Sequence, residues 1–340
     1  MKAIQLQRHG DSHKAFNIIE TEKPSPNAGE VLIKVASSGL NFADVLARRG
    51  LYADAPPMPS ILGYDVSGVI EEVGEGVEDL EKGQRVTALS RFGGYAEYVS
   101  TMREGVAVIP DDMDFNEATA YATQGCTAYF CAEECTSLHA GDKVVVHAAA
   151  GGVGSLLVQI AKHHGCFIYG TASSSKIEYL KNLGVDHPID YTKSEFHAII
   201  KENHPEGIDV IFDSLGGKTF RRGMSVLGPG GRMISFGAAS QISGTDTSKI
   251  KALGVALNFG LYSPIPLLMQ SKSIITVNML RIADHRPHVF KHVLDEVVRM
   301  AGKKILKAQV SKVFPASEIG NAHDFLESRS SIGKVAISWQ

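Results

Sequence analysis

Hydrophobic and polar positions divide the chain into two regions with different periods. From residue 1 to about residue 120, short runs of β-branched and alternating residues are separated by glycine turns. This spacing is typical of a small barrel-like β domain. The strands that we expect there are Val31–Val35, Val66–Val73, Lys82–Ala88 and Gly93–Val99. An alanine-rich helix over Asn116–Ala132 is expected to lead the chain out of this domain.

From about Gly141 onward, strand and helix patterns alternate, which predicts a parallel sheet covered on both faces. The strands expected in this sheet are Val144–Val146, Phe167–Thr171, Val185–Tyr191, Ile208–Asp213, Arg232–Gly237 and Ile274–Val277. The helices expected between them are Lys176–Leu183, Phe196–Glu202 and Phe220–Leu227. Farther along, His288–Ala301 has the pattern of an amphipathic helix, and Val310–Phe314 and Val335–Ser338 read as strands that rejoin the β domain.

A glycine turn stands between the first strand and the first helix of the alternating region. Small residues run from Ala148 into Gly151, Gly152 and Gly154, and the helical spacing begins at once. A diphosphate binds to backbone N–H groups at a helix N-terminus, and side chains in the turn would keep it out. The strand, turn and helix therefore predict the first unit of a dinucleotide-binding fold, although alanine takes the first glycine position of the usual motif.

The composition excludes several classes of partner. The chain has 340 residues with a net charge of −3, so nothing in its charge favours nucleic acid or an anionic membrane. The longest apolar stretch, residues 252–269, contains Asn258, Pro264 and Pro266, which favours a covered segment or a subunit contact over a membrane span. The four cysteines form no C-x-x-C pair, and the N-terminus has no apolar signal core. We expect a cytoplasmic protein with reduced thiols.

The order of these segments resembles the medium-chain dehydrogenase/reductase superfamily, and within it the quinone oxidoreductase branch. The motifs that carry the resemblance are Ser38–Asp44, Arg49–Tyr52, Gly63–Val69, Ala148–Gly154 and Gly228–Arg232. The runs NFADVLARRGLY, GTASSSK and HPIDY are also similar to the vesicle amine transport protein group of that branch.

The resemblance implies an α/β fold of two domains. An N-terminal GroES-like β-barrel catalytic domain over residues 1–122 is completed by the C-terminal segment 272–340. A Rossmann domain with a doubly wound parallel sheet occupies residues 123–271. The branch also implies a homodimer.

Zinc-dependent members of the superfamily use a cysteine and a histidine that this sequence replaces with Asn41 and Tyr64. Neither is a usual ligand of such a site, and the cysteines of the structural zinc lobe are missing, so we expect no metal. Without a Lewis acid an alcohol is a poor hydride donor, whereas a quinone or an α,β-unsaturated carbonyl compound accepts hydride readily. The sequence therefore favours quinone or enone reduction.

The phosphorylated coenzyme NADPH is favoured over NADH. An acid that would bind the adenosine ribose is expected about 20 residues past the glycines, but Ser173, Ser174, Ser175 and Lys176 stand there. Hydroxyls and a lysine suit a 2′-phosphate, and the resemblance adds Tyr191. These serines can also cap the following helix.

Candidate site residues follow from these readings. We expect Asn41 and Tyr52 to donate to the substrate oxygen and Tyr64 to stand where a metal ligand would be, while Asp44 braces its loop. By analogy with the family, Gln124 and Thr127 lie along the nicotinamide. The complete set expected at the coenzyme is Thr127, Ala150, Gly151, Gly152, Val153, Gly154, Ser173, Ser174, Lys176, Tyr191, Ser214, Phe236 and Gly237.

Two functions of different classes stay open at this point. The first is an NADPH-dependent, zinc-free reductase of quinones or enones. The second is an NADPH-binding protein without turnover that serves as a membrane-associated adaptor, which the likeness to the vesicle group suggests. A zinc alcohol dehydrogenase is a third reading, and metal analysis tests it.

Overall fold

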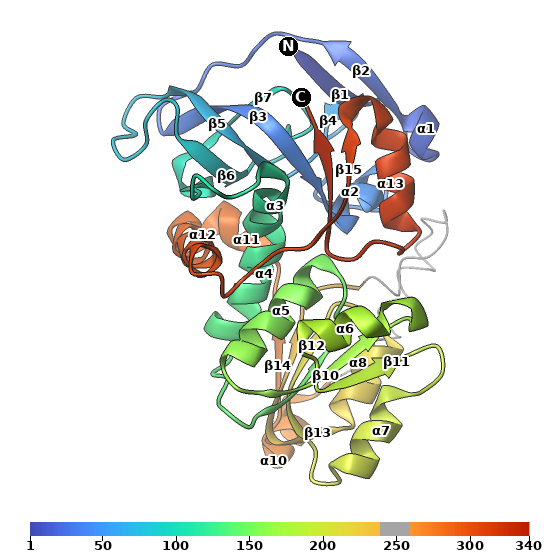
Figure 1. The fold of residues 1–340 in the computed structure, drawn as a ribbon. Helices are drawn as coiled ribbons and strands as arrows, with labels where there is room; N and C mark the ends of the chain where they lie inside the picture. Colours follow the sequence, from blue (N-terminus) through green and yellow to red (C-terminus); the bar gives the residue numbers. More distant parts are fainter. Residues whose placement is uncertain (239–258, 261, 340) are drawn as a thin grey trace. The chain divides into compact units, whose positions relative to one another are not determined.

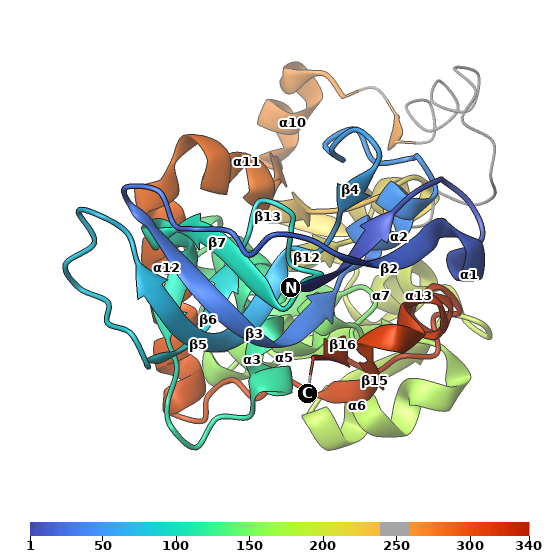
Figure 2. The ribbon, with the colours of Figure 1, turned by 90° about the horizontal axis from the view of Figure 1, so that it is seen from above.

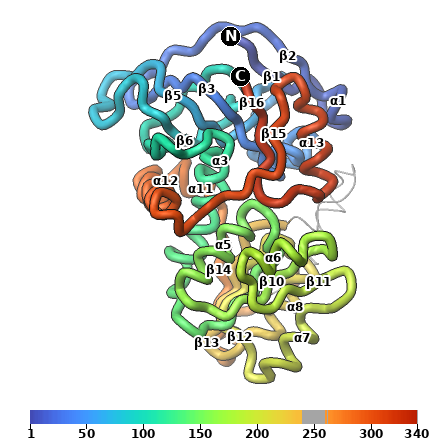
Figure 3. The backbone as a smooth tube through the Cα atoms, in the orientation of Figure 1, coloured from blue at the N-terminus to red at the C-terminus, as the bar shows by residue number. Residues whose placement is uncertain are grey.

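The computed structural model describes residues 1–238, 259, 260 and 262–339, which form two compact units (Figure 1). Unit 1 consists of Met1–Cys126 and Met279–Gln340, and unit 2 consists of Thr127–Asn278. In Figure 3 the red C-terminal segment lies with the blue N-terminal strands in unit 1. Unit 1 is therefore assembled from both ends of the chain, whereas unit 2 is one continuous stretch.

Unit 1 is built on a seven-stranded sheet of order β15-β16-β3-β5-β6-β8, in which β7 also pairs with β3. A second sheet has the order β2-β1-β4. The late strand β16 (Lys334–Ser338) runs antiparallel to β3 (Glu30–Leu40), and Figure 2 shows the red C-terminal strands beside the blue β3. The other strands are β1 Lys2–Leu6, β2 Phe16–Glu20, β4 Ser60–Ile61, β5 Asp65–Val73, β6 Arg85–Leu89, β7 Tyr98–Met102, β8 Val106–Val108 and β15 Val310–Pro315.

Helices cover the sheets of unit 1. Helix α3 contacts β3, β5 and β16, and α13 contacts β15 and β16. The amphipathic helix α12 buries Val293, Leu294 and Val297 on its apolar face. The helices of this unit are α1 Ser12–Ala15, α2 Phe42–Arg48, α3 Phe115–Ala120, α11 Met279–His285, α12 Pro287–Gly302 and α13 Ile319–Glu327. The expected strands 310–314 and 335–338 and the expected helix 288–301 are thereby confirmed within a residue or two.

Unit 2 contains a six-stranded sheet of order β11-β10-β9-β12-β13-β14, and every pairing in it is parallel. Its strands are β9 Lys143–Val146, β10 Phe167–Ala172, β11 His187–Asp190, β12 Ile208–Asp213, β13 Leu227–Ser235 and β14 Ser273–Thr276. Its helices are α4 Cys126–Tyr129, α5 Gly152–His163, α6 Ile177–Leu183, α7 Phe196–Asn203, α8 Lys218–Met224 and α10 Pro264–Gln270, α4 beginning in unit 1. The expected doubly wound parallel sheet is confirmed.

Two expectations in the N-terminal half are corrected. The strand expected over Gly93–Val99 begins only at Tyr98, because Gly93 has a φ of 82° and the buried Tyr95 exchanges backbone hydrogen bonds with Leu62 and Ile4 instead of joining a ladder. The long helix expected over residues 116–132 begins at Phe115 and changes to wider π-type turns after Ala120. Asp114 caps it by accepting from the N–H groups of Asn116 and Glu117.

The longest apolar stretch lies partly outside the described residues, at positions 252–258 and 261. Its last part forms helix α10, on which Ile265, Leu268 and Met269 are exposed by 67%, 80% and 82%. These three side chains are exposed, whereas Leu267 of the same helix packs on the core of unit 2, and a subunit contact stays a prediction. Among the described residues, none of the helices combines the length and the apolar character needed to cross a membrane.

Candidate active site and coenzyme site

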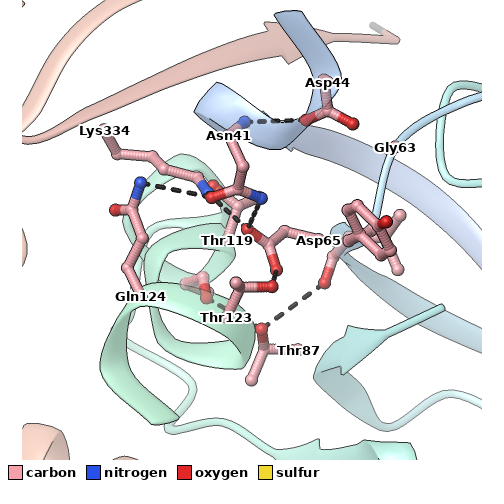
Figure 4. Close-up of polar contacts among 12 residues, drawn as sticks. Asn41, Asp44, Gly63, Asp65, Thr87, Thr119, Thr123, Gln124 and Lys334 are labelled. Carbon is pink, nitrogen blue, oxygen red and sulfur yellow. Dashed lines mark hydrogen bonds and ion pairs between the residues drawn. The ribbon is translucent and has the colours of Figure 1, made fainter. Parts of the chain in front are cut away.

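The centre of unit 1 holds a fully buried ion pair that joins the two ends of the chain. Lys334, the first residue of β16, donates from Nζ to a carboxylate oxygen of Asp65, and both side chains are completely inaccessible (Figure 4). Thr123 also donates to this carboxylate, at its other oxygen. A Cβ atom on Gly39 would overlap with the end of the lysine side chain, so the glycine makes room for Lys334. A buried charge is stable only when it is paired and hydrogen-bonded, and here both ions are.

Asn41 is held in one orientation by this pair. Its Nδ2 donates to Asp65 (2.7 Å), and its Oδ1 accepts from Lys334 Nζ (3.1 Å). The ammonium can only donate and the carboxylate can only accept, so the amide cannot be turned round. Because Oδ1 is an acceptor, Gln124 directs its Nε2 to it at 3.4 Å, and the buried Gln124 Oε1 has no hydrogen-bond partner in the described chain. The network thus leaves one buried amide acceptor, Gln124 Oε1, without a hydrogen bond among the described residues.

Asp44 does brace the loop that carries Asn41, because it accepts from the Asn41 backbone N–H at 2.8 Å. It is fully buried, and burial raises the pKa of its carboxyl to about 7, although the bond from Asn41 lowers it. The negative charge of Asp65 raises this pKa further, and Lys334 lowers it. Asp44 is therefore a group that exchanges a proton near neutral pH.

The two tyrosines expected at the substrate lie together. The rings of Tyr52 and Tyr64 are edge to face with centroids 6.4 Å apart, and Tyr64 also packs on Phe92 at 4.7 Å. Tyr64 is buried and Tyr52 is half-buried. Burial raises the pKa of both hydroxyls, and the charge of Asp44 adds to this in each case. Both tyrosines therefore keep their protons at physiological pH.

In unit 2 the glycine turn leads from β9 into helix α5. Gly151 precedes the first turn of α5, which Gly152, Val153 and Gly154 begin. A Cβ atom on Gly154 would overlap with the Ala148 carbonyl oxygen and lie 2.9 Å from Ala149 Cα, so only glycine lets the helix approach the strand so closely. Helix α5 has 12 residues and no acidic residue in its first turn. Its N-terminus is suited to an anion.

The other expected coenzyme residues follow neighbouring strands at the same edge of the sheet. Ser214 follows β12, and Phe236 and Gly237 follow β13; a Cβ atom on Gly237 would lie 2.7 Å from the Ser214 carbonyl oxygen. Ser173 to Lys176 follow β10 and Tyr191 follows β11. Thr127 is the exception, since it belongs to helix α4. Parallel strands carry their ligands at the carboxyl edge, and this set lies there.

The structure does not support the alternative in which these serines cap the following helix. Ser173 occupies the position before the turn Ser174–Lys176, but its side chain forms no capping hydrogen bond. Ser174 instead donates from Oγ to Asp190 at the end of β11. Lys176 is half-buried, and burial lowers the pKa of its ammonium.

Sequence reasoning missed three charged residues of these sites. Asp65 stood within a motif that was matched but was given no role, and Lys334 opens a strand that otherwise reads as apolar. Asp190 lies outside the window in which an acid at the ribose was sought. A lysine in an apolar strand was the one local signal, because such a charge needs a buried partner. Among the described residues, no three His, Cys, Asp or Glu side chains come together as a metal site would require.

Comparison with known proteins gives consistent matches over both units. The family described as alcohol dehydrogenase GroES-like domain matches residues 27–111, and the family described as zinc-binding dehydrogenase matches residues 152–299. The synaptic vesicle membrane protein VAT-1 homolog of Homo sapiens is 32% identical over 315 residues, which are 92% of this chain and 80% of that protein. The 2-haloacrylate reductase of a Burkholderia species is 31% identical over 99% of this chain and 98% of its own length.

A solved structure of Escherichia coli quinone oxidoreductase complexed with NADPH matches the whole fold. The TM-score is 0.84 at 25% identity, with 99% of this chain and 100% of that chain covered. The curated relatives and this structure cover both units, so the likeness is not confined to one of them.

Proposed function

The chain belongs to the medium-chain dehydrogenase/reductase superfamily, in its quinone oxidoreductase and VAT-1-like branch, and on that premise we propose that it reduces quinones or α,β-unsaturated carbonyl compounds with NADPH and without zinc. The relatives support this class of reaction, because one is named as a 2-haloacrylate reductase and another, a quinone oxidoreductase, was solved with NADPH.

The observation that carries the proposal is the position of Lys334. Its ammonium group lies on the Asp65 carboxylate and on the Asn41 carbonyl oxygen, which are the oxygen ligands that a cation would need at this place. A divalent ion would meet a buried positive charge there, so these residues do not fit zinc. Hydride transfer to an acceptor that delocalises its own negative charge suits a site of this kind better than alcohol oxidation does.

NADPH, when bound, supplies the hydride, and the chain's own groups bind and orient the reactants. The N-terminus of α5 and the turn at Gly151 hold the diphosphate, and Ser174 and Lys176 hold the 2′-phosphate. Tyr52 is the first candidate for the donor to the acceptor oxygen, because it is half-buried and keeps its proton. Asn41 has both amide atoms engaged, so we assign it an indirect role through Gln124.

A second candidate function rests on the likeness to the VAT-1 homolog, which is named as a synaptic vesicle membrane protein. In that case the chain binds NADPH and does not turn over, and it serves as an adaptor.

One experiment separates these functions. NADPH binding is titrated by fluorescence, and NADPH oxidation is followed with a panel of 1,4-quinones and enones, with a reaction without protein as the blank. Saturable oxidation that depends on the acceptor supports the reductase, and tight binding without oxidation supports the adaptor. Failure to bind NADPH contradicts both, and stoichiometric zinc in the purified protein contradicts the metal-free site.

A Tyr52→Phe variant tests the donor. Loss of one preorganised donor is expected to lower kcat about 10²-fold to 10³-fold while the NADPH affinity is unchanged. Tyr98→Phe is the matched control, because Tyr98 lies in β7 and its ring faces Lys23. Unchanged turnover of Tyr52→Phe contradicts the assignment.

A further inference from the structure

An acidic side chain, Asp190, lies at the place where the adenosine ribose is expected. It belongs to a different strand from the one after which the sequence predicts such an acid. In a dinucleotide-binding fold the ribose lies at the end of the second strand, which is β10 here. Strands β10 and β11 are in parallel register, with Ala172 opposite Asp190. Asp190 therefore ends β11 directly beside the end of β10 and takes the edge position that the usual ribose-binding acid occupies from β10.

The carboxylate is held firmly in this place. Its Oδ1 accepts from the backbone N–H of Thr192 (3.0 Å) and from the Thr192 hydroxyl (2.6 Å), and its Oδ2 accepts from Ser174. The bonds from Ser174 and Thr192 lower the pKa of Asp190 to about 2, so the group is ionised at every physiological pH. Lys193 forms only a solvent-exposed ion pair with Asp190, with its Nζ 3.5 Å from Oδ2 and 72% of its side chain exposed.

The Asp190 carboxylate is expected to affect the binding of NADH and of NADPH in opposite directions. A ribose 2′-hydroxyl donates a hydrogen bond, and an ionised carboxylate accepts it strongly. A 2′-phosphate carries about two negative charges, which the same carboxylate repels. Ser174 can serve either coenzyme, because its hydroxyl rotates freely and donates to Asp190 or to a phosphate oxygen.

We propose that Asp190 is the residue that sets the coenzyme selectivity, by accepting from the 2′-hydroxyl of NADH and weakening the preference for NADPH that Ser174 and Lys176 create. The inference rests on the proposed function and deepens it. The chain is then a reductase that accepts both coenzymes with modest discrimination, and Asp190 is the cause.

The test measures the dissociation constants of NADPH and NADH in the full chain carrying Asp190→Asn. Asparagine keeps an acceptor for Thr192 and presents an N–H donor toward Ser174, so the loop is preserved. Removing a unit charge roughly 5 Å from a 2′-phosphate in water changes affinity by about tenfold. NADPH is expected to bind that much more tightly, NADH is expected to bind more weakly, and added salt is expected to reduce the gain for NADPH.

Glu206→Gln is the matched control. The pKa of Glu206 is also lowered to about 2, and this glutamate pairs with Lys143 at the start of β9, on the opposite edge of the same sheet. The Glu206→Gln substitution removes the same charge as Asp190→Asn and is expected to leave the affinities for NADPH and NADH unchanged.

The outcomes are distinguishable. Opposite shifts for the two coenzymes support the inference, since a variant that only damages the loop weakens both. Equal shifts or unchanged affinities in Asp190→Asn overturn it while the proposed function stands. If the unsubstituted protein binds neither coenzyme, the proposed function itself fails.

Discussion

Replacing Lys334 with methionine should reveal how strongly unit 1 depends on its buried ion pair. Methionine has a similar length and fits beside Gly39, so the change removes the charge and leaves little empty space. The Asp65 carboxylate then keeps its bonds from Thr123 and Asn41 but loses the ammonium group. Breaking a buried pair on one side costs about 3–5 kcal/mol. That is a large part of the roughly 5–15 kcal/mol by which domains are stable.

The assay is urea unfolding followed by tryptophan fluorescence. The chain has one tryptophan, Trp339, whose Nε1 donates to Ser38 Oγ at 2.9 Å, so the signal reports on unit 1. In the double variant Lys334→Met with Asp65→Asn neither member of the pair carries a charge, and we expect about half of the lost stability to return. Lys304→Met is the control, because both side chains of the Lys304–Asp112 pair are about 70% exposed. This substitution is expected to change stability by about 1 kcal/mol or less.

Three results would refute this reasoning. If Lys334→Met unfolded at the same urea concentration as the unsubstituted protein, the pair would not be buried as an ion pair. If the double variant were less stable than Lys334→Met alone, an unpaired Asp65 charge would not be the cause of the loss. If Lys304→Met cost as much, the effect would be one of net charge and not of burial.

Two further predictions concern stability and the glycine turn. The pKa of the buried His323 is lowered to about 3, so below its usual pKa of about 6.5 the unfolded chain takes up a proton that the folded chain does not. The free energy of unfolding should therefore fall by up to about 1.4 kcal/mol per pH unit below that point. Between pH 7 and pH 5, measured by urea unfolding, His323→Phe should lose about 2 kcal/mol less of this free energy than the unsubstituted protein does. An identical pH dependence of the two proteins would contradict this. Gly154→Ala places a Cβ atom against the Ala148 carbonyl and should weaken NADPH binding in the fluorescence titration by about tenfold or more. Gly302→Ala is its control, because a Cβ there meets Pro110 at 3.6 Å, an ordinary contact, and should leave the affinity unchanged.

The sequence predicted those features that depend on neighbouring residues. The β-branched run before Gly151, the helical spacing after it and the alternation that follows are local patterns, and they indicated the parallel sheet. The strand expected from Gly93 failed because the partners of the buried Tyr95 are Leu62 and Ile4, which no pattern within seven residues can show.

The buried ion pair of unit 1 could not be predicted from the sequence for a related reason. Lys334 and Asp65 are 269 residues apart in the chain, and the lysine meets the acid through the pairing of β16 with β3 and of β3 with β5. Asp190 was missed because the register of β10 and β11, and not the distance from the glycines along the chain, places it beside the end of β10.

The split of unit 1 has a consequence for biosynthesis. Unit 2 is continuous from Thr127 to Asn278 and can fold on the ribosome while translation proceeds. Unit 1 cannot complete its sheet until Lys334–Ser338 has left the exit tunnel, and until then the Asp65 carboxylate has no counterion. A nascent chain paused before this point carries an open edge on β3 over Ser37–Leu40, and the unpaired backbone groups of this edge are exposed to strands of other chains.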